Sequence, residues 1–289
     1  MGEPPEVLMR VGLVPDSVVE TVAGLEALFE QSLPGSRALA RVHGRTDLDD
    51  LLSAGSRAVI RGARAPRRRG RITPRWGLAD VARKSESGSI SAEWSTGYGP
   101  GHASWQTHIN WFDDQPDSPS GRYVDVRMKI RGRTDEFVRQ PDARDDLAGV
   151  LAHTMRAFPA AYGYVTVSTF PDDPRAAVNS CGFFDGLDGA LGYSWMVWLP
   201  PATALRIGDR PSSPNVDVID VGEPINRGRL VVASIPPCYM DDDDLRSYRD
   251  FLTPALLPPN LEAPLRRRTD LARPAGILAD DWIDGAPDR

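Results

Sequence analysis

Polar side chains that could bind a partner recur at every second position of three segments in the middle of the chain. Mixed charge together with aromatic rings is typical of protein recognition surfaces. We therefore predict a partner-binding face; a plain solvated sheet face is the alternative interpretation. The face is predicted to comprise Glu93, Gln106, His108, Tyr123, Asp125 and Arg127, beside Asn110.

Four adjacent carboxylates form a second candidate site near the C-terminal end, at Asp241, Asp242, Asp243 and Asp244. One or two of them would suffice to cap a helix or to interact with its dipole. Adjacent like charges repel, so the hypothesis is an electrostatic contact of this run with a basic partner.

Histidine and cysteine do not form a convincing metal or nucleophile pattern. His102 and His108 would lie about 20 Å apart along one strand, too far to share an ion. Cys181 could be paired with His153 as its base, but no protease signature surrounds Cys181, and His153 is expected to face solvent. No phosphate-binding loop is visible. The sequence therefore predicts no catalytic residue, metal or cofactor; an enzyme with a site near residues 179–192 is an alternative.

The composition is that of a globular protein with a sizeable core. The chain has 289 residues, of which 41% are hydrophobic, enough for one large domain or two modest ones. Its two cysteines are too few for a secreted disulfide framework, and we see neither a signal peptide nor an apolar run long enough to span a membrane. We therefore expect a cytoplasmic protein without membrane association.

Charge is distributed unevenly along the chain. The net charge is −6, and residues 61–75 hold seven arginines and no acid, so the rest of the chain carries −13. Residues 65–74 have no apolar periodicity, which predicts a loop. The arginine-rich segment also lacks the interleaved aromatic residues that stack on bases, which favours a solvated loop and makes nucleic acid an unlikely partner.

The elements that must position these residues predict an α+β fold with a mainly antiparallel sheet and helices packed on one side. The alternating segments predict a three-strand meander. An N-terminal βαβ unit is predicted from a strand over residues 7–14, a helix over 17–33 with a capping box of Ser17 and Glu20, and a strand over 38–43.

The second half of the chain mixes amphipathic helices with strands. Nearly continuous apolar runs over residues 193–199 and 230–235 are typical of central strands, in which we expect Trp195 or Trp198 to be buried. The other predicted elements are helices over residues 145–158 and 243–256 and a strand over 164–170. We predict a single domain over residues 1–262, with possible lobes 1–80 and 81–262, and an Arg/Pro/Asp-rich tail over 263–289.

Residues 193–254 carry a resemblance to a known family. A Trp-bearing strand runs into Leu199 and Pro200, and a helix that ends at Pro254 closes the stretch. Its other landmarks are Trp195, Trp198, Ile207, Gly208, Gly222, Glu223, Pro224, Asn226, Arg227, Tyr248, Arg249 and Leu252. In these features the chain resembles the C-terminal half of bacterial type VI secretion and polymorphic-toxin immunity proteins.

The resemblance implies a cytoplasmic, non-catalytic protein that neutralises a cognate toxin by occluding it. It supplies no catalytic residues. The expected partner is a protein, the cognate toxin, and an acidic body would attract a basic toxin. Besides the enzyme, a structural or scaffold protein is the other alternative; the oligomeric state stays open.

Overall fold

The computed structural model describes most of the chain as separate stretches. They are residues 6–31, 36–44, 58–62, 68–70, 82–83, 87–95, 104–112, 121–168, 193–210, 215–222 and 228–256. The chain divides into two compact units. The N-terminal unit is Glu6–Gly163, and the C-terminal unit is Tyr164–Arg289 together with Met1–Pro5. Strand β7 (Ala160–Ser168) contains the boundary.

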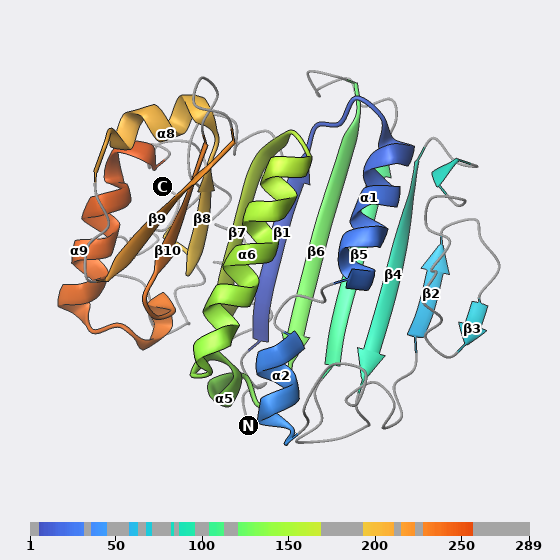
Figure 1. Ribbon diagram of the computed structural model, residues 1–289, viewed down its shortest axis with the longest axis horizontal. Helices are drawn as coiled ribbons and strands as arrows, with labels where there is room; N and C mark the ends of the chain where they lie inside the picture. Colours follow the sequence, from blue (N-terminus) through green and yellow to red (C-terminus); the bar gives the residue numbers. More distant parts are fainter. Residues whose placement is uncertain are drawn as a thin grey trace, which may run out of the picture. The chain divides into compact units, whose positions relative to one another are not determined.

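The N-terminal unit is built on an antiparallel sheet whose strand order is β3-β2-β4-β5-β6-β1, followed by β7 (Figure 1). Its strands are β1 (Glu6–Leu13), β2 (Ala58–Gly62), β3 (Arg68–Gly70), β4 (Ser87–Ser95), β5 (Ser104–Phe112) and β6 (Tyr123–Arg131). Its helices are α1 (Val18–Gln31), α2 (Ser36–Val42), α5 (Thr134–Val138) and α6 (Pro141–Ala157). Strands β4, β5 and β6 are the predicted meander, which is confirmed.

Alternation along the strands separates the two faces of this sheet. Val7, Met9 and Val11 of β1 and the alternate residues of β6, from Val124 to Ile130, are almost fully buried. Helices α1, α2 and α6 lie over one face of the sheet (Figure 1), and amphipathic helices cover the apolar face of a sheet because both then remove apolar surface from water. The predicted packing of helices on one side therefore holds for this unit.

The region after α1 differs from the prediction. Residues 38–43 were expected to form a strand, which is wrong: they belong mostly to α2, so β1 is followed by two helices. Alanine and leucine favour helix, and the run was too short for its period to decide between helix and strand. Tertiary packing stabilises the helix, because its residues 38–40 are fully buried. Arg37 and Arg41 add ion pairs with Asp146 and Asp142 of α6.

Other boundaries shift by a few residues. Helix α6 begins at Pro141, earlier than expected, with proline in the first turn, where its missing N–H is not needed. The predicted loop over residues 65–74 contains β3, which pairs with β2. Ser17 Oγ accepts a hydrogen bond from the Glu20 backbone N–H at 3.4 Å, as predicted from the capping pattern.

The C-terminal unit contains an antiparallel arrangement in the order β8-β10-β9. Its elements are β8 (Met196–Leu199), α8 (Pro201–Ile207), β9 (Val216–Val221), β10 (Gly228–Ala233), the short 3-10 helices η3 (Pro237–Tyr239) and η4 (Thr253–Ala255), and α9 (Asp242–Leu252). Trp195 and Trp198 are both buried, which confirms that prediction. The Tyr248 hydroxyl of α9 donates a hydrogen bond to the Ser194 carbonyl at 2.6 Å, which ties that helix to the entry of β8.

The observed class is α+β with a mainly antiparallel sheet, as predicted. Within the part of the chain that the structure describes, no helix is both long and apolar enough to cross a membrane. Three expectations lie outside the described residues: the loop at residues 179–192, His102, and the tail at 263–289.

Two glycines provide a matched test of the packing. A Cβ on Gly228 would lie 2.0 Å from the Trp198 ring, whereas a Cβ on Gly149, on the exposed side of α6, would meet nothing within 4 Å. We expect Gly228→Ala to lower the free energy of unfolding by about 1–3 kcal/mol and Gly149→Ala to raise it by about 0.5–1 kcal/mol. Urea unfolding measures both, and a Gly228→Ala variant as stable as the parent would contradict the close approach of β10 to Trp198.

Candidate functional site

The face of the sheet opposite the apolar one carries the polar residues. Register places Arg10 of β1 beside Arg127 of β6, and Arg127 beside His108 of β5. The neighbouring pairs on the same face are Glu6 with Arg131, Leu8 with Lys129, Gln106 with Lys129, Asn110 with Asp125, and Phe112 with Tyr123. Period-2 alternation therefore gathers charged groups from three strands that are far apart in the sequence.

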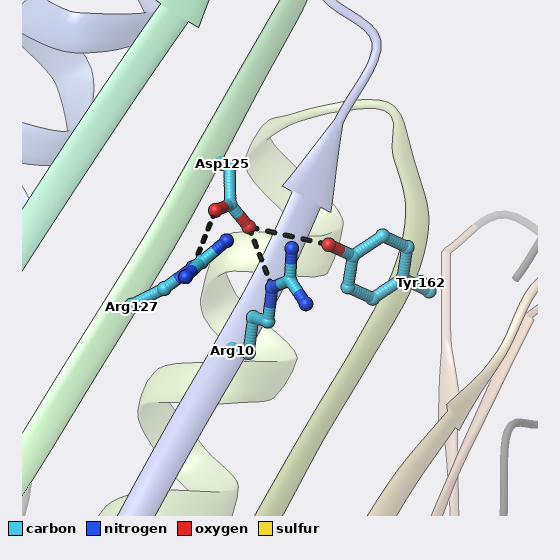
Figure 2. A network of polar contacts seen from close by, with 4 residues as sticks. All are labelled: Arg10, Asp125, Arg127 and Tyr162. Carbon is cyan, nitrogen blue, oxygen red and sulfur yellow. Dashed lines mark hydrogen bonds and ion pairs between the residues drawn. The ribbon is translucent and has the colours of Figure 1, made fainter. Parts of the chain in front are cut away.

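Asp125 is the centre of a network of polar contacts on this face (Figure 2). Its Oδ1 accepts hydrogen bonds from Arg10 Nε at 2.8 Å and from the Tyr162 hydroxyl at 3.2 Å, and its Oδ2 accepts one from Arg127 Nε at 2.7 Å. The Arg10 guanidinium also lies 5.5 Å from the centroid of the Tyr162 ring, within the range of a cation–π interaction. The carboxylate is only 2% exposed, so these contacts replace the water that it has lost.

Glu6 repeats this arrangement further along β1. Its Oε2 lies 2.6 Å from Arg131 Nε, its Oε1 lies 3.1 Å from Lys129 Nζ, and its side chain is 5% exposed. Two buried carboxylates therefore hold three cations of β6: Asp125 pairs with Arg127, and Glu6 pairs with Lys129 and Arg131.

The three anchored cations, Arg127, Lys129 and Arg131, are named here the cationic row. They stand at alternate positions of one strand, with side-chain exposures of 46%, 28% and 42%. The carboxylates that hold them are buried, so the charge that β6 presents to solvent is positive. The two arginines are held at Nε and Lys129 at Nζ, while all three side chains remain partly accessible to solvent.

An aromatic pair lies at one end of β6. Phe112 stacks on Tyr123 with ring centroids 5.7 Å apart and planes inclined by 7°, and Phe112 remains 40% exposed. Burial raises the pKa of the Tyr123 phenol to about 12, and the negative charge of Asp125 adds to the shift. Tyr123 is therefore a neutral packing residue at physiological pH.

The structure corrects the predicted face in one respect. Tyr123 and Asp125 were expected to be solvated, but both are buried, because arginines on two strands cover Asp125 and Phe112 covers Tyr123. Gln106 and His108 are partly buried, and Arg127 is exposed. For Glu93 the structure gives the backbone register alone, opposite Gln106. Whether any of these residues contacts a partner stays a prediction.

The acidic run belongs to the other unit, at the start of α9. Asp241 is its N-cap, and its Oδ1 accepts from the backbone N–H groups of Asp243 and Asp244 at 3.1 and 2.9 Å. Asp244 Oδ1 accepts from Asn215 at 2.8 Å, and Asp242 lies in the first helical turn. Capping and the helix dipole therefore account for much of this cluster.

Several residues of the site were missed from the sequence, namely Glu6, Arg10, Lys129, Arg131 and Tyr162. The available signal was a pair of charges, Glu6 and Arg10, in an otherwise apolar strand. A charge in a buried strand needs a partner, which register supplies once the pairing of β1 with β6 is known. That pairing joins segments more than 100 residues apart, so no local pattern indicates it.

No observation on the described residues indicates metal or nucleophile chemistry. No group of three or more His, Cys, Asp or Glu among them could hold a metal ion. His153 is exposed, as predicted, and its proposed partner Cys181 lies outside the described residues. The chain matches no family model, no curated protein and no solved structure.

Removing the Asp125 charge tests the network. Asp125→Asn would leave the buried Arg10 without its counter-charge, and breaking a buried ion pair costs about 3–5 kcal/mol. The matched control is Glu136→Gln, which removes the exposed ion pair with Arg133 and should lower stability far less, because solvent screens that pair. Chemical denaturation measures both variants; equal and small losses would contradict the structural role of Asp125.

Alkaline titration tests the burial of Tyr123. Its pKa is about 12 in the folded protein against 10.0 for an unperturbed phenol. The folded state therefore holds this proton more tightly than the unfolded state, so the stabilisation is complete below pH 10 and is lost as the pH rises through 12. We expect the free energy of unfolding to fall more steeply over this window in the parent than in Tyr123→Phe. Parallel curves for the two proteins would show that Tyr123 titrates normally in the fold.

Proposed function

We propose that the chain is a non-catalytic, immunity-type binding protein that neutralises a cognate toxin by occluding it. The observation that carries the proposal is the cationic row: two arginines and a lysine that are partly exposed and that each form an ion pair with a buried carboxylate. Arginine is enriched in protein interfaces, and side chains that are already ordered lose less conformational entropy on binding.

The resemblance of residues 193–254 to toxin immunity proteins supports the same class of function. Tyr248 and the two tryptophans of that stretch are core residues, so their place in the motif is structural. In this proposal the C-terminal unit carries the family resemblance and the N-terminal unit carries the binding surface. The proposed location is the cytoplasm, where an immunity protein would meet a toxin made or delivered there.

Co-expression with the product of the adjacent gene tests this function. We expect that product to be toxic alone, to be tolerated with this chain, and to co-purify with it at low salt. Occlusion requires one molecule of inhibitor for each toxin, so toxin activity should fall linearly and reach zero at one equivalent. Neutralisation by far less than one equivalent would indicate an enzyme instead, and a non-toxic neighbour that forms no complex would contradict the proposal.

A further inference from the structure

The cationic row has a spacing that selects the kind of chain able to bind it. Residues at alternate positions of a strand are about 6.6–6.8 Å apart, so the row presents three positive groups at that repeat on one face. An extended peptide with acidic residues at every second position places its carboxylates on one side at the same repeat. The two patterns match without bending either chain.

We infer that the cationic row binds an extended acidic segment of a protein partner, with one carboxylate over each of Arg127, Lys129 and Arg131. The inference rests on the proposed function and names the chemistry of the contact. It also revises the expectation of a basic partner at this face, because the predicted acid Asp125 is buried while Arg127 is exposed.

The hydrogen bonds of the two arginines leave their outer nitrogens available. Asp125 and Glu6 each take the Nε of one arginine, and within the described part of the chain these are the side-chain hydrogen bonds that Arg127 and Arg131 donate. The terminal nitrogens can therefore donate to a second carboxylate, with the guanidinium plane already oriented. Such charge-assisted bonds are shorter and stronger than neutral ones.

The balance of charge favours an incoming anion. Among the described residues, three cations share two carboxylates, and one of these, Asp125, also neutralises Arg10. A short acidic segment adds the missing negative charge locally. A nucleic acid would extend its phosphates over a chain with a net charge of −6, which repels a long polyanion. The observations therefore favour a protein segment.

A peptide titration tests the inference. The probe is a blocked, fluorescently labelled peptide with three glutamates alternating with serines, and the matched probe has glutamines in their place. We expect the full-length protein to bind the glutamate peptide at low ionic strength, to lose it as salt is added, and to bind the glutamine peptide at least about fivefold more weakly. Equal binding of the two peptides, or no binding of either, would overturn the inference.

Four variants locate the binding. Lys129→Gln and Arg131→Gln should each weaken binding of the glutamate peptide by about two- to fivefold, whereas Arg156→Gln, which removes the same charge from an exposed position of α6, should leave it unchanged. Far-ultraviolet circular dichroism and thermal unfolding establish that each variant is folded. Arg127→Lys keeps the charge beside Asp125 and should retain most of the affinity. If one variant fails to fold, the remaining variants still test the binding site. Equal effects of all substitutions would overturn the assignment.

Two further binding measurements distinguish this inference from a nucleic-acid partner and from the proposed immunity function. A single-stranded oligonucleotide with three phosphates that bound as tightly as the peptide would overturn the choice of a protein partner. If the adjacent gene product binds the parent, Lys129→Gln and Arg131→Gln equally, the proposed function stands and the inference fails. If the peptide maps to the cationic row while no adjacent product is bound, the surface chemistry stands and the immunity function fails.

Discussion

The arrangement of the N-terminal unit depends on the burial of one carboxylate, Asp125. A buried ionised group is tolerated when oppositely charged groups and hydrogen bonds replace its lost hydration. Arg10 and Arg127 supply the charges and Tyr162 the third hydrogen bond, from β1, β6 and β7. Those strands must therefore lie in the register that brings these donors to Asp125. A slip by one residue would turn every polar side chain of a strand toward the apolar face.

The same interaction determines what the surface presents. Since the carboxylates of Asp125 and Glu6 are buried and the side chains of Arg127, Lys129 and Arg131 are partly exposed, the exposed charge has the sign opposite to that of the whole chain. The net charge of the chain therefore does not indicate the sign of the charge exposed on this face. A sheet face with ordered cations would bind a partner at a smaller entropic cost, because part of the side-chain entropy has already been lost during folding.

The sequence predicts the local parts of this arrangement and misses the long-range ones. The alternation of Val124, Val126 and Met128 locates β6, because a half-buried strand has a strict period of two. Residues 36–42 form a helix where a strand was predicted, because a seven-residue element is decided by its contacts with α6. Arg10 was missed because its partner is 115 residues away. The alternating polar positions identified the face. Which of these side chains reach solvent depends on contacts with other strands, which the local pattern does not contain.

The most direct test of the buried-carboxylate account is proton exchange at the guanidinium groups. In uniformly ¹⁵N-labelled protein near neutral pH, the Nε–Hε protons of Arg127 and Arg131 should exchange with water at least about tenfold more slowly than that of Arg156, because each is donated to a buried carboxylate. Asp125→Asn should speed the exchange at Arg127 and leave that at Arg131 unchanged. Exchange at Arg127 and Arg131 as fast as at Arg156 would show that the row is not anchored, and would contradict the account.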